Sequence, residues 1–538
     1  MKEDRMPHTA LARLFKDMYV VLEEANQRKI PFEQVVYEWK RKAAHPLALP
    51  HAEPIASPFH PPVQASRYVS ASRIAIIGGG LAGLTCAYRL EQAGFAPVVF
   101  EADHKKIPGR VDTRRGAFDD RQSIERGGML IDTGHVALRR LIEELGLTLN
   151  DLLAAEVRGT EPCYYFDGAP YTLADATRDF QGVVPKLNAD LKAAGFPTMY
   201  NQYTPRGLEL DRMSVVDWIE ESVPGGKLSK FGKLIDIACN IEYGAESSQQ
   251  SALNFLYLHD YIPDGEKFSV FGVSDERYHV RGGNDQIAHR LMDRLAPGTL
   301  QRGCRLIAIA ETADGSYRLT LQDRSGTHEV AAEHVVLTIP FSILRSSVDY
   351  SKAGFRPLKT SAIEELGMGA NSKLHVQFTD RHWTSTGCNG DTITDGGYQN
   401  TFDVTRGQSG KSGILVAYSG GNVAEGMNLG SLPERAQQFL HQLEPVVPGI
   451  TPRWNGKVTR DYWPGNPFSL GSYAYRKVGQ YTKFTGIEGE REGSKGACHF
   501  AGEHTSVVFQ GYMNGAVETG ERAAAEIMEA LWAEESEE

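Results

Sequence analysis

The best-defined pattern of apolar and polar positions in the chain lies between Arg73 and Glu101. An apolar run from Arg73 to Ile77 predicts a buried strand, and it leads directly into a glycine-rich turn. The alanine- and leucine-bearing segment after the turn predicts a helix that ends at about Ala93. A second apolar run, residues 96–100, predicts another strand, which ends at Glu101. The pattern therefore predicts a strand, a tight turn, a helix and a second strand.

The glycines of this turn follow the spacing G-x-G-x-x-G at Gly78, Gly80 and Gly83. The first glycine permits the turn, the second lets a pyrophosphate approach the backbone, and the third lets the helix pack on the strand. Glu101 follows Gly83 by 18 residues, near the offset at which a carboxylate accepts hydrogen bonds from ribose hydroxyls. An ordinary glycine-rich turn would not require these elements in this order. We therefore predict a dinucleotide-binding site.

The segments before and after this unit have weaker patterns. Apolar residues at helical spacing from Leu11 to Ala44 predict two amphipathic helices, and the prolines of residues 45–66 predict an extended linker. Residues 150–280 are rich in helical patterns, and Ser214 is placed to cap one of the helices. Residues 384–397, rich in Gly, Thr and Asp, indicate a mobile stretch. The other predicted elements are a strand after paired glycines at 129–131, helices at 136–145 and 287–295, strands at 305–310, 317–322, 334–339, 373–378 and 498–501, and a long helix from about 512.

Composition and charge narrow the range of partners. A chain of 538 residues is too long for a single core and indicates two or three domains. The formal charge of −11 disfavours nucleic acid and anionic membranes as main partners. We see no signal peptide and no apolar run of about 20 residues, so we expect no membrane segment and a cytoplasmic location. The six cysteines lie far apart without a C-x-x-C motif, so neither a metal site nor a disulfide scaffold is expected.

Several separated motifs resemble the FAD-dependent amine oxidase family, most nearly its bacterial L-amino acid oxidases, over about residues 70–530. The dinucleotide motif with Glu101 matches the family's ADP-binding turn. Pro108-Gly109-Arg110-Val111 is similar to the family's G-G-R-V element, with Pro108 in place of the first glycine. The most specific match is AGEHTS…GYMNGAVETGERAA near the C-terminus.

The resemblance implies an FAD cofactor. Glu503 would hold its ribityl or pyrophosphate region, and the helix N-terminus at Tyr512-Met513 would point at the flavin C2 carbonyl, where reduced flavin accumulates negative charge. Ser472 stands where monoamine oxidases carry the cysteine that bonds to flavin, so the FAD is expected to be non-covalent. The residues that the resemblance assigns to FAD are Gly78, Gly80, Leu81, Ala82, Gly83, Glu101, Gly109, Arg110, Gly127, Gly128, Met129, Leu130, Glu503, Gly511, Tyr512 and Met513.

The resemblance also implies three catalytic residues. Lys373 corresponds to the lysine that holds a water against flavin N5, and Tyr473 and Tyr512 correspond to the aromatic rings that flank the substrate amine. The alternatives are an exposed strand lysine and ordinary core packing of the two tyrosines. No Ser-His-Asp or Cys-His signature is present, and hydride transfer to a flavin needs no protein nucleophile.

The predicted reaction is oxidative deamination of an L-amino acid to a 2-oxo acid, ammonia and H2O2, with O2 as the oxidant. Leu130 stands where many L-amino acid oxidases carry the arginine that pairs with the substrate carboxylate, and a buried unpaired charge is very costly. A monoamine or polyamine oxidase, or a monooxygenase that gives an amide, is therefore an alternative. A non-catalytic flavin-binding protein would lack Lys373 or the aromatic residues, which are present here.

The resulting fold prediction is α/β with mixed α+β parts: a Rossmann-like FAD-binding domain with an inserted substrate-binding domain and a helical N-terminal extension. We expect a small-molecule partner, an amino acid or amine together with O2, and a homo-oligomer, a dimer. The predicted boundaries are 1–66 for the extension and linker, 67–135, 281–345 and 461–538 for the FAD-binding domain, and 136–280 and 346–460 for the substrate domain.

Overall fold

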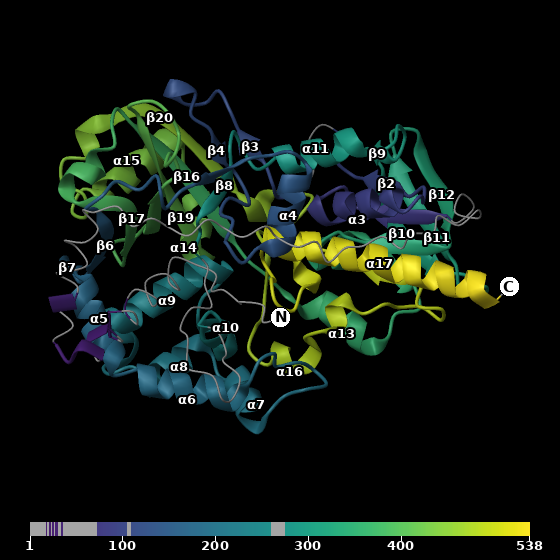
Figure 1. Ribbon diagram of the computed structural model, residues 1–538, viewed down its shortest axis with the longest axis horizontal. Coiled ribbons are helices and arrows are strands. Elements are labelled where there is room, and N and C mark those ends of the chain that lie inside the picture. Colours follow the sequence, from purple (N-terminus) through teal and green to yellow (C-terminus); the bar gives the residue numbers. More distant parts are fainter. Residues whose placement is uncertain are drawn as a thin grey trace.

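A computed structural model describes residues 73–104, 109–259 and 275–537 of the chain, together with a few positions between 18 and 35. The two predicted N-terminal helices lie largely outside the described residues, and the linker at 45–66 lies wholly outside them. Figure 1 shows two sheet regions, with β16, β17 and β19 toward the upper left and β2, β9 and β10 on the right, and a cluster of helices, α5 to α10, below the first region.

The first sheet is parallel and is assembled from distant parts of the chain. Its strand order is β22-β13-β1-β2-β9, and every neighbouring pair is parallel. The bounds are Cys498–Phe500, His334–Leu337, Ile74–Ile77, Val98–Glu101 and Leu300–Arg302, in that order. All four residues of β1 are buried, as expected for a strand that is covered on both faces.

One face of this sheet is covered by two helices that pack against each other, α3 (Leu81–Gln92) and α17 (Met513–Glu537). Figure 1 shows α17, in yellow, running alongside α3 toward the C-terminus. The other face is covered by a four-stranded sheet in the order β12-β11-β10-β14. The N-termini of both helices are thereby brought to the same side of the molecule, beside the cavity described below.

The second sheet has seven strands in the order β20-β16-β19-β18-β17-β6-β7. Its pairings are antiparallel except for β17 with β6. The strand β16 (Asn371–Phe378) is buried along its whole length. Its residues Leu374, Val376 and Phe378 pack into an apolar core that includes α15 (Leu432–Leu443), so its other face is directed toward the cavity side.

The helical cluster covers one end of this second sheet. The helix α8 (Val215–Ser222) begins at Ser214, whose hydroxyl accepts from the Asp217 N–H while the Asp217 carboxylate accepts from the Ser214 N–H. This capping box confirms the predicted cap. The helix α9 (Lys230–Tyr243) is buried along most of its length and ends at Gly244 in a left-handed conformation. This helix end places Glu242 and Tyr243 at the cavity.

Two predictions about local structure are wrong, a strand and a mobile stretch. Residues 129–131 do not form a strand, and Ile131 makes only an isolated bridge to Tyr278. The carbonyls of Gly128 and Met129 are instead bonded by the side chain of Asn284, so no neighbouring strand is needed. The stretch 384–397 was predicted to be mobile, yet it contains β17 inside the second sheet. Its polar residues are satisfied internally, as by the bond between the hydroxyls of Thr392 and Thr401.

The other described elements are as follows: β3 Thr113–Arg114, β4 Ile124–Glu125, α4 Val136–Glu144, β5 Leu149–Asp151, β6 Glu161–Phe166, β7 Ala169–Tyr171, α5 Leu173–Gln181, α6 Val184–Ala194, α7 Pro205–Asp211, α10 Ala252–Tyr257, β8 Tyr278–Val280, α11 Gln286–Arg294, β10 Arg305–Glu311, β11 Tyr317–Asp323, β12 Gly326–Ala332, α12 Phe341–Ser347, β14 Asp349–Lys352, α13 Pro357–Glu365, β15 Gly367–Met368, β17 Cys388–Thr394, β18 Gln399–Asp403, β19 Gly413–Gly420, α14 Gly421–Met427, β20 Trp454–Tyr462, β21 Ala474–Tyr475 and α16 Gln480–Phe484. Within the described residues, no helix is long and apolar enough to cross a membrane.

Candidate active site

A cavity of about 1020 Å³ connects the parallel sheet with the second sheet. Gly78, Gly80 and Glu101 line one end, and Lys373 and Tyr473 line another part. The volume lies at the upper limit of the roughly 300–1,000 Å³ that is usual for ligand pockets, so the cavity can hold a long ligand together with a second small molecule. Of the residues that the sequence assigned to cofactor and catalysis, all except Gly83 line this cavity.

The glycine turn has the geometry of a phosphate-binding turn. Gly78 has a φ of 107°, which favours glycine, and a Cβ on Gly83 would lie 2.0 Å from the Gly78 carbonyl oxygen. Gly83 therefore serves the packing of helix on strand and does not contact the cavity. A Cβ on Gly80 would meet no atom within 4 Å, and no side chain caps the N-terminus of α3. Open space and free N–H groups meet there, as an anion requires.

Glu101 ends β2 next to this turn. One of its carboxylate oxygens accepts from the Gly79 N–H at 2.7 Å, and the other accepts from the Asp103 N–H at 2.7 Å. The carboxylate is thus fixed at the cavity wall by the backbone of two strand ends. Because a carboxylate has about four acceptor positions, capacity remains for the hydroxyls of a ribose.

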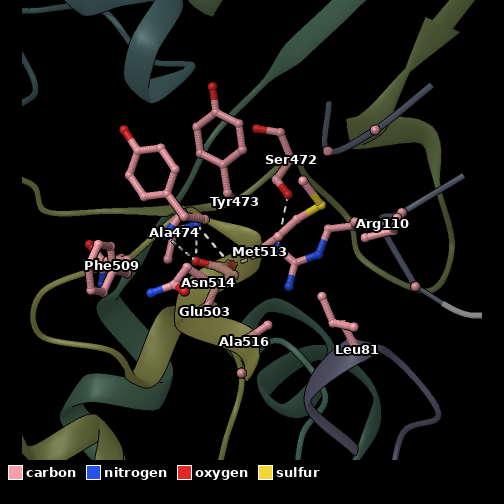
Figure 2. Close-up of a pocket in the computed structure, with 18 of the residues that line it drawn as sticks. Leu81, Arg110, Ser472, Tyr473, Ala474, Glu503, Phe509, Met513, Asn514 and Ala516 are labelled. Atoms are coloured by element: carbon pink, nitrogen blue, oxygen red, sulfur yellow. Dashed lines mark hydrogen bonds and ion pairs between the residues drawn. The ribbon is translucent and has the colours of Figure 1, made fainter. Parts of the chain in front are cut away.

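The residues around the N-terminus of α17 form a second anchored group (Figure 2). Arg110 Nη1 donates to Glu503 Oε1 at 2.6 Å and to the Ser472 carbonyl at 2.9 Å. The Gly511 N–H donates to the other Glu503 oxygen at 2.8 Å. Glu503 therefore holds Arg110 and the turn before Met513 in place, a positioning role that the sequence did not predict.

Lys373 lies at the cavity wall with its side chain turned toward the segment that precedes α4. Its Nζ donates to the Gly127 carbonyl at 2.6 Å and to the Glu125 carbonyl at 3.1 Å. The residue is 6% exposed, so the alternative of an exposed strand lysine is excluded. Burial lowers the pKa of Lys373 to about 8, although Glu125 and Asp461 oppose this shift.

Aromatic side chains surround the part of the cavity beside Lys373. The hydroxyls of Tyr473 and Tyr418 lie 2.7 Å apart, and the Tyr418 ring centre lies 5.7 Å from Lys373 Nζ. Tyr512 donates to Glu242 Oε1 at 2.8 Å. Burial raises the pKa of Glu242 to about 8, because the carboxylate is removed from water and the bond from Tyr512 compensates only in part.

Sequence reasoning missed Glu242 and Tyr418. Both line the cavity, from α9 and β19 respectively. The signal for Glu242 is the one carboxylate in the segment IACNIEYG at the end of a largely buried helix, where an unpaired acid is unfavourable. Tyr418 has no local signal, since an aromatic residue in a strand is usually core packing.

Most arginines of the cavity wall are paired with acidic side chains, whereas Lys373 is held by backbone carbonyls. Leu130, which replaces the carboxylate-binding arginine of L-amino acid oxidases, lines the cavity wall. In the parts of the chain that the structure describes, each arginine that lines the cavity away from its glycine end has an acidic partner. These pairs are Arg110 with Glu503 at 2.6 Å, Arg140 with Glu521 at 2.5 Å, Arg406 with Asp391 at 2.5 Å and Arg476 with Glu488 at 3.0 Å.

The parallel sheet, the glycine turn and the carboxylate at the end of β2 define a protein that binds a dinucleotide cofactor. The chain matches the profile of the flavin containing amine oxidoreductases over residues 81–528, and it belongs to this family. The predicted family is thereby confirmed, and the cofactor is FAD.

Relatives with different substrates are similar to the chain at comparable levels. Flavin-containing amine oxidase A of Sus scrofa is 27% identical and is aligned over 85% of this chain and 85% of its own length. YobN of Bacillus subtilis (strain 168), provisionally classed as an L-amino-acid oxidase, is 26% identical over 84% of this chain and 94% of its own length. The flavin-dependent L-tryptophan oxidase RebO of Lentzea aerocolonigenes is 25% identical over 83% and 96%.

Solved structures confirm the predicted fold class. Cyclohexylamine oxidase from Brevibacterium oxydans IH-35A superposes with a TM-score of 0.72 at 21% identity, covering 86% of this chain and 99% of that chain. Wild-type putrescine oxidase bound to putrescine gives a TM-score of 0.70 at 20% identity, covering 85% and 99%.

The residues present fit an FAD. The open space beside Gly80 and the uncapped N-terminus of α3 suit its pyrophosphate, and Glu101 suits a ribose. The N-terminus of α17 at Met513 lines the same cavity as Lys373 and the tyrosines. Among the described residues, no group of three or more His, Cys, Asp or Glu side chains is arranged to hold a metal ion.

Proposed function

We propose that this protein oxidises an amine that lacks an α-carboxylate, releasing an imine that hydrolyses to a carbonyl compound and ammonia, and that O2 is reduced to H2O2. FAD would accept the hydride, which carries both electrons of this two-electron oxidation. The observation that carries the proposal is the Glu242 carboxyl at the cavity wall, which is bonded to Tyr512 and lines the same cavity as Tyr418 and Tyr473.

The residues of the chain have separate roles in this proposal. Tyr473, Tyr418 and Tyr512 orient the amine between aromatic faces and exclude water from it. Glu242, once ionised, pairs with the cationic form of the substrate. Lys373, held by two carbonyls, keeps a positive charge near the site where negative charge develops when O2 is reduced. The FAD is non-covalent, because Ser472 offers a hydroxyl in place of a thiol.

The charge distribution favours an amine over an amino acid. A carboxylate that enters this cavity needs an unpaired cation, since leaving it uncompensated in a dry site is very costly. Arg406 and Arg476 of the cavity wall are already paired with Asp391 and Glu488. Glu242 is bonded only to Tyr512 among the contacts that the structure records for it. A cationic substrate without a carboxylate can pair with Glu242 and needs no further cation from the cavity wall.

An L-amino acid is the second candidate, as the sequence analysis predicted. It is favoured by the similarity to YobN and RebO over most of the chain. Residues 260–274 lie outside the part of the chain that the structure describes. The peroxide assay below tests both candidates directly.

The test is a peroxide assay with matched pairs that differ only by the carboxylate. The pairs are phenethylamine with L-phenylalanine and cadaverine with L-lysine, and CO2 release is measured in parallel to detect an amide-forming monooxygenase. We expect peroxide from at least one amine at a rate well above that of its amino acid partner. Turnover of the amino acids alone would replace the first candidate by the second.

A further inference from the structure

The strand β16 carries a polar face that continues away from the cavity. Lys373, His375 and Gln377 alternate along it and are all buried. Gln377 is bonded to the Asp119 carbonyl at 3.2 Å, so the segment around β3 and β4 covers this face. Between the two bonded residues, His375 is 0% exposed, and neither of its ring nitrogens has a hydrogen-bond partner in the described structure.

The neighbouring strand β20 adds two further polar groups to the same patch. Asp461 lies opposite Lys373, and Thr459 lies opposite His375. Residues directly opposed on antiparallel strands point to the same side of the sheet. Asp461 Oδ2 and Thr459 Oγ1 are both buried without a hydrogen-bond partner among the described residues. With the two imidazole nitrogens, four such atoms lie together behind Lys373.

Four unsatisfied polar atoms in one patch are a strong indication of bound water. Each buried donor or acceptor without a partner costs about 1–3 kcal/mol, and native proteins satisfy nearly all of them. Ordered water commonly supplies the missing bonds, provided that several polar groups surround it. His375, Thr459 and Asp461 together meet this condition.

The patch reaches the protein surface through an ion pair. The other oxygen of Asp461 accepts from Arg114 Nη2 at 2.8 Å and from Arg126 Nε at 2.6 Å. The Arg126 side chain is 31% exposed and also pairs with Asp112 at 2.5 Å. Polar groups therefore extend from Asp461, which lies opposite Lys373 in the sheet, to the partly exposed side chain of Arg126.

Oxidation of an amine releases a proton, and such a connection offers a route for it. The substrate R–CH2–NH3⁺ becomes R–CH=NH2⁺ when a hydride passes to the flavin and one proton is released, and this proton must leave a site from which water is excluded. We propose that ordered water held by His375, Thr459 and Asp461 carries this proton between Lys373 and the surface at Arg126. The proposal rests on the amine oxidation described above, and the three side chains act as positioning residues for the water.

The charges around His375 suit this role. Burial holds the pKa of His375 well below its ordinary value, and the facing charges of Lys373 on its own strand and of Arg114 on β3 lower it further. From β20 the facing charge is Asp461, and from β19 the residue in register is the uncharged Val416. The imidazole is therefore neutral over the working pH range and can donate and accept a bond at the same time.

The kinetic test uses variants of the holoenzyme with FAD content checked first. Anaerobic flavin reduction by an amine is followed in H2O and D2O for wild type, His375→Leu, Thr459→Val and the control Val416→Ala, which alters packing on the same face. General acid–base steps are worth about 10²–10⁴-fold, so we expect reduction to slow by about a hundredfold in His375→Leu, with a larger solvent isotope effect. His375→Gln, which still hydrogen-bonds, should recover most of the rate. Rates and isotope effects equal to those of Val416→Ala in both His375→Leu and Thr459→Val would overturn the proposal.

A crystal structure of the holoenzyme provides a readout that is independent of activity. We expect water density within hydrogen-bonding distance of the His375 nitrogens, Thr459 Oγ1 and Asp461 Oδ2. No water at these atoms would overturn the proposal even if the variants were slow. If no amine reduces the wild-type flavin, the proposed function fails, while the water density still decides whether the path exists.

Discussion

Replacing Glu242 by glutamine should abolish a pH dependence of amine binding. With a pKa of about 8, the wild-type carboxyl is neutral at pH 6, and it must ionise to pair with an ammonium. Ionising it two units below its pKa costs about 2.7 kcal/mol, which weakens binding about a hundredfold relative to pH above 8. Glu242→Gln cannot ionise, so its affinity should be low and should lack the part of the pH dependence that comes from this carboxyl.

The assay uses a cation that cannot be oxidised. tert-Butylamine has no hydrogen on the carbon next to nitrogen, and with a pKa near that of lysine, about 10.4, it stays charged between pH 6 and 9. Its dissociation constant is read from the perturbation of the flavin spectrum, with tert-butanol as the neutral control. At pH 9 the wild type should bind the amine about ten- to a hundredfold more tightly than the variant, as expected for a charge-assisted bond. Equal pH profiles in wild type and Glu242→Gln would refute the reasoning.

A stability measurement on the same variant checks the pKa shift without a ligand. The folded pKa of Glu242 lies above its ordinary value of 4.5, so the folded state binds the proton more tightly than the unfolded state. The free energy of unfolding therefore decreases as the pH rises from about 4.5 to 8. Glu242→Gln should therefore be more stable than wild type at pH 8, by up to a few kcal/mol, and not at pH 4.5.

Three further predictions concern the cofactor and Lys373. Lys373→Met should leave the protein folded and loaded with FAD, while flavin reoxidation by O2, measured by stopped-flow absorbance, slows about a hundredfold. The reason is the loss of a buried positive charge beside the reduced oxygen species. Wild-type rates in both half-reactions would contradict this. Acid precipitation should release all of the FAD into the supernatant, because Ser472 cannot form a thioether, and flavin retained in the pellet would disprove the non-covalent attachment. Glu101→Ala and Glu503→Ala should each weaken FAD binding about ten- to a hundredfold in a flavin fluorescence titration. The first variant loses an acceptor for a ribose hydroxyl, and the second loses the carboxylate that holds Arg110. Unchanged affinity in both variants would mean that FAD lies elsewhere.

The elements that sequence predicted correctly are those whose signal is local. The turn at Gly78 and the helix after it follow from residues that touch each other along the chain, as Gly83 touches the Gly78 carbonyl. The same holds for the cap at Ser214 and for the strand that carries Lys373. These patterns need no knowledge of the tertiary fold.

The parts that sequence missed depend on distant contacts. Glu242 and Tyr512 are 270 positions apart, and only the fold brings the carboxyl to the aromatic group. Residues 388–394 have a loop-like composition, but their polar side chains bond to each other inside the sheet, and this pairing overrides composition. Residues 129–131 have a strand-like pattern, but the Asn284 side chain bonds to the carbonyl of Met129, and only Ile131 pairs with another segment, by an isolated bridge.

The central claim is that an amine without a carboxylate reduces the FAD held in this cavity. The most direct measurement is anaerobic mixing of the purified yellow protein with phenethylamine or cadaverine and, separately, with L-phenylalanine or L-lysine, while the flavin absorbance is recorded. The account predicts that at least one of the amines bleaches the flavin in a stoichiometric titration, that its amino acid partner does so far more slowly, and that admitted O2 restores the colour with formation of H2O2. Bleaching by the amino acids alone, or by none of the four compounds, would contradict it.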